Sequence, residues 1–241
     1  EVVTGTAHNS ASGSLSLGTG ASSKSSGAIR IQAGNSEDDG GNVLIAGAHS
    51  SGALGGSVVL RSGSPSSHGS SGELQIVSGA STNVGTSGSV SVGSGTSVNA
   101  ATGSTSLFSG DSFEGRTGDV HVRAGQSQSG QGGDIQVGAH SDSGGQVTIA
   151  SGGSADGIGI VLASSSSSVG VSGDIALQTG TSVGPSSGGI QIATGASSEG
   201  SSGHISIVGG HSSSGQSDVS IAAGSSSMDN GGGILISSGT S

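Results

Sequence analysis

A short phrase recurs about every fifteen residues along the whole chain. It reads Gly, any residue, aliphatic, any residue, aliphatic, any residue, small residue, and clear copies occupy residues 27–34, 188–195 and 232–239. A fixed period in this range is typical of stacked repeat architectures, in which each unit contacts only its neighbours. The phrase therefore favours a long and uniform object over a domain built around a single pocket.

The aliphatic positions define sixteen copies of the phrase. Of the 32 aliphatic slots, 31 hold Ile, Leu or Val, and Thr105 is the exception. Alternate side chains of an extended chain project to opposite faces, so each pair of aliphatics predicts a short strand with one apolar face. Helix is excluded, because no window has a 3.6-residue apolar period. The first aliphatics stand at 15, 29, 43, 58, 74, 90, 105, 120, 135, 147, 160, 175, 190, 205, 219 and 234.

The residues between the predicted strands are typical of tight corners. Glycine supplies backbone conformations that other residues avoid. The third slot of each copy holds a small residue, which we expect to keep a coil thin by facing its interior. A serine recurs early in each corner, and its hydroxyl is expected to bond to nearby backbone groups as a turn motif. These serines are Ser22, Ser36, Ser81, Ser97, Ser112, Ser127, Ser182, Ser197, Ser212 and Ser226.

We therefore predict an all-β fold: a single-stack β-solenoid of about sixteen coils, each of about fifteen residues, forming one repeat domain over residues 1–241. The alternative is an antiparallel β-meander of the same repeats. The solenoid is favoured because parallel coiling gives identical units identical neighbours. The chain begins with Glu1 and has no initiator Met, so we expect a processed chain or a segment of a longer one.

Composition limits the partners of such a chain. Glycine (52) and serine (60) make up nearly half of it, as in flexible linkers, but linkers have no reason to space aliphatics regularly. The net charge is −10 with five Lys and Arg, which disfavours nucleic acid and anionic membranes. There is no apolar run near the ~18 residues of a spanning helix. The absence of cysteine removes disulfides and thiolate metal sites, and is compatible with secretion.

No constellation of residues predicts a catalytic, cofactor or metal site. Glu37, Asp38 and Asp39 form the one acidic cluster, which either binds calcium or is simply solvated. Asp119 and Asp134 hold the same slot in adjacent copies, where a bridging cation or plain solvation are the alternatives. The histidines form no ladder and are expected at the surface. They are His8, His49, His68, His121, His140, His204 and His211.

Some copies carry extra aliphatics on the face that is otherwise polar. These residues are Leu44, Val59, Val161 and Leu235. They represent either tolerated variation or a contact surface for another subunit. The aliphatics alone are too few to offset the conformational entropy of so long a chain, so we expect association with other copies of itself. Exposed serines leave O-linked glycans open as further partners.

The sequence of residues 173–182 is Gly-Asp-Ile-x-Leu-x-Thr-Gly-x-Ser. This sequence and the other repeats of the chain resemble Gly/Ser-rich β-repeat regions of secreted structural proteins of heterokont algae. The resemblance covers the whole chain and implies a fibre, wall or flagellar-hair component, with no catalytic residues to transfer. We predict a structural subunit of an extracellular filament, surface appendage or sheath, located outside the cell or at its surface, that assembles with itself through stacked β-repeats and is not an enzyme. The alternative is the repeat stalk of an adhesin or an ice-binding protein.

Overall fold

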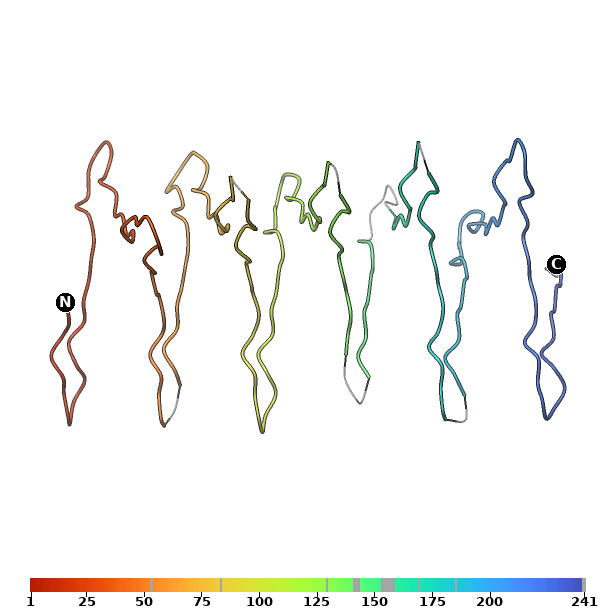
Figure 1. The fold of residues 1–241 in the computed structure, drawn as a ribbon, viewed down its shortest axis with the longest axis horizontal. Helices are drawn as coiled ribbons and strands as arrows, with labels where there is room; N and C mark the ends of the chain where they lie inside the picture. Colours follow the sequence, from red (N-terminus) through yellow and green to blue (C-terminus); the bar gives the residue numbers. More distant parts are fainter. Residues whose placement is uncertain are drawn as a thin grey trace. The chain divides into compact units, whose positions relative to one another are not determined.

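The backbone is a succession of extended segments and outward loops. The computed structural model describes residues 1–52, 54–82, 84–128, 130–140, 144–152, 159–168, 170–184 and 186–239. Over these residues there is neither a helix nor a strand (Figure 1). The chain divides into two compact units, Glu1–Val122 and Arg123–Ser241.

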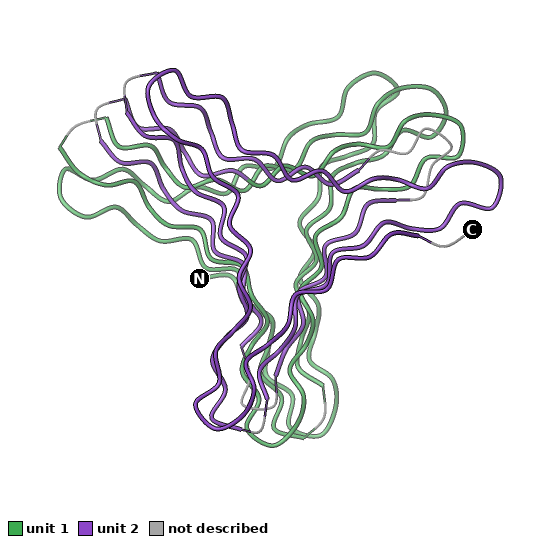
Figure 2. Ribbon diagram, turned by 90° about the vertical axis from the view of Figure 1, so that its right-hand side faces the viewer, with its two compact units in different colours: residues 1–122 green, residues 123–241 purple. Residues whose placement is uncertain are grey.

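Within each unit, one loop follows each extended segment. The chain runs along a segment, turns at the outer end of a loop and returns, and the two limbs approach each other at the base of the loop (Figure 1). Taken by itself, unit 1 sends its loops outward in different directions, and so does unit 2 (Figure 2). The loops correspond to the corners expected from sequence, and the extended segments to the aliphatic pairs.

The predicted β-solenoid is wrong, and so is the alternative β-meander. A sheet needs neighbouring backbones about 4.8 Å apart and joined by a ladder of hydrogen bonds. Three backbone–backbone hydrogen bonds occur among the described residues, and each joins the two limbs of one loop. They run from the N–H of Gly56 to the carbonyl of Ala48, from Gly72 to Gly63 and from Gly232 to Gly224. Within the described ranges, the aliphatic segments form no ladder with one another, so no stacked coils are found there.

The segments nevertheless keep the alternation of an extended chain. The Arg30 Nε donates to the Gln32 Oε1 at 2.7 Å, and the Gln75 Nε2 donates to the Glu73 Oε1 at 2.8 Å. Side chains two residues apart meet in this way because alternate residues of an extended backbone lie on the same side. The period of two therefore describes the local backbone correctly, although no sheet results from it.

The predicted aliphatic core is absent from the described part of the chain. None of its residues is buried. Six residues are half-buried, and all six occupy the small third slot of the phrase. They are Ala33, Ser62, Ser78, Ser109, Ala124 and Gly209. The tightest packing thus lies at the small residues and not at the aliphatics.

We expect the isolated chain in dilute solution to give a far-ultraviolet circular dichroism spectrum without the bands of helix or sheet. The reason is that its aliphatic segments have no ladder partner within the described chain. The measurement is a dilution series in low salt, with sedimentation used to confirm the monomer. A β-sheet spectrum from the verified monomer would contradict the fold described above.

Candidate functional site

Wherever the structure describes both ends of a loop, its base is closed by a contact that we call the loop neck. It forms between the small third slot of one copy and the glycine that opens the next. A Cβ on Gly27 would lie 3.4 Å from the Thr19 Cγ2, and the Thr19 Oγ1 donates to the Gly27 carbonyl at 3.1 Å. The small slot therefore closes a loop and does not line a coil interior. The necks are Thr4–Gly13, Thr19–Gly27, Ala33–Gly41, Gly47–Gly56, Ser62–Gly72, Ser78–Gly88, Ser94–Gly103, Ser109–Gly118, Ala124–Gly133, Ala139–Gly145, Ser164–Gly173, Thr179–Gly188, Thr194–Gly203 and Ala223–Gly232.

One neck exchanges the roles of its two residues. The opening position of the copy at residue 219 holds Ser217, and the small slot facing it holds Gly209. A Cβ on Gly209 would lie 2.6 Å from the Ser217 Oγ, which can rotate away, and 3.3 Å from the Ser217 carbonyl oxygen. This neck still contains a glycine, although it stands on the other limb of the loop.

The necks separate a constant part of the repeat from a variable part. The block from the opening position to the small slot is seven residues long in every copy, as in 27–33 and 188–194. Five residues lie between the neck residues Ala139 and Gly145, and nine lie between Ser62 and Gly72. The 12-to-16-residue spacing of the phrase thus reflects loop length alone.

A serine hydroxyl organises the outer part of the loops, as predicted from sequence. The Ser197 Oγ accepts a hydrogen bond from the N–H of Gly200 at 3.1 Å, and the Ser112 Oγ accepts one from Gly115 at 2.9 Å. Ser50 and Ser167, which sequence reasoning did not single out, accept equivalent bonds. Each such bond satisfies a backbone donor inside the loop. The prediction is confirmed at Ser22, Ser36, Ser97, Ser112, Ser127, Ser182, Ser197, Ser212 and Ser226.

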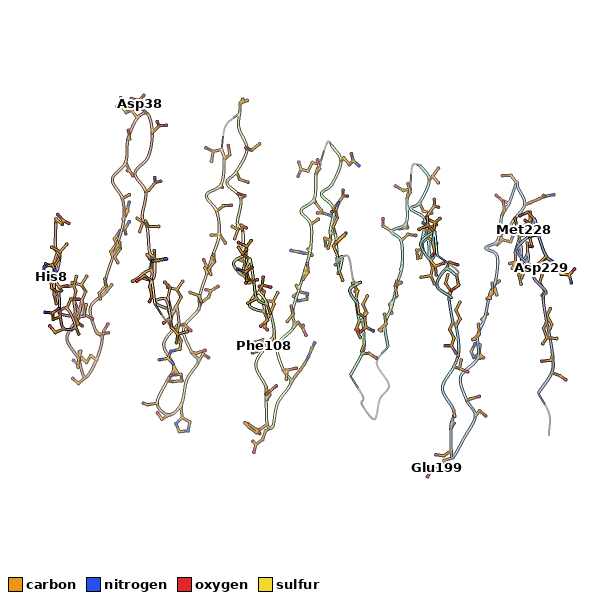
Figure 3. The ribbon with its side chains drawn as sticks, turned by 90° about the horizontal axis from the view of Figure 1, so that it is seen from below. His8, Asp38, Phe108, Glu199, Met228 and Asp229 are labelled. Atoms are coloured by element: carbon orange, nitrogen blue, oxygen red, sulfur yellow. The ribbon has the colours of Figure 1, made fainter. Side chains whose placement is uncertain are left out.

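The acidic residues weighed as cation ligands lie at the surface. Asp38 stands at the outer end of its loop, as Glu199 does in another loop (Figure 3), and the Asp38 N–H donates to the Ser36 Oγ at 3.2 Å. Among the described residues, no group of three or more His, Asp and Glu side chains gathers where it could hold a metal ion. The bonding in this loop is that of the ordinary serine turn.

Asp119 is paired with a cation of its own repeat. The Arg116 Nη2 lies 3.0 Å from the Asp119 Oδ1, and the His121 Nε2 lies 3.9 Å from the Asp119 Oδ2. The side chains of Arg116 and Asp119 are 83% and 55% exposed. Exposed ion pairs contribute about 0–1 kcal/mol at most, since water screens them. This pair therefore makes a weak local contact.

A hollow in the described chain is lined by four consecutive residues, 123–126. It is therefore formed by one short stretch of chain and does not bring distant residues together.

The feature that recurs in both units is a set of exposed aliphatic positions, the two aliphatic slots of each copy, which we call the aliphatic row. The first member of a pair is less exposed than the second, as in Ile190 (51%) and Ile192 (65%). On the opposite face, Leu44 and Leu235 are 88% and 91% exposed. Sequence reasoning identified these residues correctly as the structural signal but placed the pairs in a core. In the structure each of these aliphatic side chains is exposed.

Comparison with known proteins identifies no relative. No protein-family model matches the chain, and no curated protein or solved structure is significantly similar to it. The resemblance to secreted algal repeats therefore stays a prediction. Over the described residues, no helix is present that could cross a bilayer. Function has to be argued from the necks, the loops and the aliphatic row.

We expect Gly56→Ala to open its loop neck. The added Cβ would lie 2.7 Å from the Ala48 backbone nitrogen, so the hydrogen bond from residue 56 to the Ala48 carbonyl is lost. Such a bond contributes about 0.5–1.5 kcal/mol, which corresponds to a roughly 2- to 10-fold shift towards the open loop. NMR amide exchange at residue 56, together with proton–proton contacts between residues 48 and 56, measures the shift.

The matched control is Gly52→Ala in the same loop, where a Cβ would meet nothing within 4 Å. It should leave amide exchange at Gly56 unchanged. Equal effects of the two substitutions would show that the loss of glycine flexibility, and not the neck contact, controls the loop.

Proposed function

We propose that this chain is a structural subunit of an extracellular or cell-surface filament, appendage or sheath, held together by contacts between its own copies. The observation that carries the proposal is the aliphatic row. Its side chains are about half-exposed or more at regular intervals, and no described residue is buried to form a core in their place. Exposed apolar surface on this scale normally marks a contact with another protein.

The remaining chemistry of the chain supports a structural role. Copies of one repeat present the same contact many times, as a homopolymer requires. Five Lys and Arg are too few for a nucleic-acid surface, and in the described chain no group of three or more His, Asp and Glu side chains gathers where it could hold a metal ion. The exposed loop serines offer hydroxyls for O-linked glycans. The absence of cysteine and the resemblance to secreted algal repeats support a location outside the cell.

We expect the purified chain to form filaments visible by negative-stain microscopy above a critical concentration. Replacing Ile190, Ile192, Ile205 and Ile207 by Ser should raise that concentration by at least about 100-fold. The estimate takes about 1 kcal/mol for the apolar surface that each half-exposed isoleucine still has to bury. Sedimentation of the assembled fraction against total concentration gives the measurement.

The control changes four loop residues outside the row, namely Ser198, Glu199, Ser201 and Ser202, to Asn. Its critical concentration should stay within a few-fold of the unchanged chain. If the unchanged chain remains monomeric at high concentration and shows no filaments, the proposed function is wrong.

Assembly should also depend on ionic strength and pH. Each chain carries a net charge of −10, so separate chains repel one another in low salt. Physiological salt shortens the screening length to about 8 Å and should lower the critical concentration. Lowering the pH towards the isoelectric point near 4.8 should act in the same direction, because the net charge vanishes there. Light scattering in matched buffers follows both effects, and assembly that weakens with added salt would contradict this account.

A further inference from the structure

The hydrogen-bonding groups of the backbone are used very unevenly along the repeat. In the described residues, the backbone–backbone bonds lie at loop necks and the serine–backbone bonds lie inside loops. Where the structure describes them, the aliphatic segments between the necks take part in no backbone–backbone hydrogen bond. Folded proteins average about one internal hydrogen bond per residue, and about two-thirds of these are between backbone groups. The printed backbone hydrogen bonds of the described chain therefore lie in the loops and at their necks, whereas the segments have backbone donors and acceptors left to pair.

The exposed area shows how much of the chain remains to be covered. The chain exposes 23865 Å². A compact protein of 22.1 kDa exposes about 9,300 Å², and its unfolded chain exposes about 32,000 Å². The excess over a compact fold is roughly 14,500 Å², whereas a standard interface covers about 800 Å² of each partner. One contact patch cannot cover that surface, so the partner must follow the chain along much of its length.

A partner of this kind has to match the period of the segments. Each segment presents two edges of free backbone groups and one aliphatic face, and it recurs every 12 to 16 residues. Another copy of the same chain has extended segments of the same length at the same intervals. The loops project away from the segments in each unit (Figure 2), so they leave the segment edges accessible. Charged residues are 8% of the chain, which limits repulsion between copies that lie close together.

We propose that the aliphatic segments pair edge to edge with the segments of other copies of this chain, so that β-sheet forms between chains and not within one. This inference rests on the proposed function, because it specifies how the subunits associate. It differs from the solenoid excluded above, in which each segment would pair with the next repeat of its own chain. Pairing between copies satisfies the segment backbone and buries the aliphatic row in the same step.

Hydrogen–deuterium exchange of the full chain, before and after assembly, tests this pairing. Amides of residues 29–31, 190–192 and 234–236 should exchange freely in the monomer and at least about 100-fold more slowly in the assembly. The amide exchange rates of the loop at 197–200 should change much less on assembly. Assembly without protection of the segments would overturn the inference and leave the proposed function standing. Protection already present in the monomer would also overturn it, and failure to assemble would overturn both.

Isotope dilution distinguishes pairing between chains from pairing within one chain in the assembled state. Chains labelled with carbon-13 are assembled alone or with a ninefold excess of unlabelled chains, and the amide I infrared band of the labelled carbonyls is compared. Coupling between neighbouring strands should be lost on dilution if the neighbours are different chains, and the band should shift. An unchanged band would place the pairing inside one chain and overturn the inference.

A set of proline variants gives an independent test. Replacing Gln191, Ser206 and Ser220 by Pro removes a backbone donor from each of three segments, and proline is excluded from the interior of a sheet. We expect the critical concentration to rise by at least about 100-fold, since each lost ladder position costs about 1 kcal/mol or more. The same positions changed to Thr should assemble normally, as should Glu199→Pro in a loop. Normal assembly of the triple proline variant would contradict edge pairing.

Discussion

The close approach of a small residue to a glycine at the base of each loop is the contact on which the rest of the structure depends. The contact is closest at Gly56, where an added Cβ would clash with the Ala48 backbone nitrogen, whereas at most necks an added Cβ would make ordinary van der Waals contact. By bringing the two limbs together, it makes each loop a local structure with its own hydrogen bonds. It also determines where each extended segment begins and ends, and so places the two aliphatics between successive necks.

The necks divide the backbone into loops and extended segments, which differ in their hydrogen bonding. Inside a loop, a serine hydroxyl and a neck bond satisfy donors that would otherwise require water. Between necks, extended backbone and half-exposed isoleucines such as Ile190 and Ile192 remain without partners in the described chain. A chain with no buried residue in its described part gains little free energy from folding alone. Its stability is therefore expected to come from contacts between copies, which is why structure and proposed function point to the same surface.

The features that could be predicted from sequence are those decided within a few residues. The alternation seen at Arg30 and Gln32 and the serine turn at Ser197 follow from local stereochemistry. The partner of a segment such as 190–192 could not be predicted, because the same residues suit a neighbouring repeat equally well. The prediction that the small slot faces the interior of a coil is wrong for a similar reason. A Thr194 that keeps a coil thin and a Thr194 that contacts Gly203 have the same sequence signature, and only the three-dimensional contact tells them apart.

The constant block and the variable loop have a consequence for how such a chain can change over evolutionary time. An insertion or deletion between two neck residues alters one loop and leaves every later block with its two aliphatics in place. Within this one chain, from five to nine residues already lie between the two neck residues of different loops. A length change inside the block would instead reverse the faces of the residues that follow it. The outer loops are accordingly the positions at which foreign peptides could be grafted at regular intervals without disturbing the remainder of the chain.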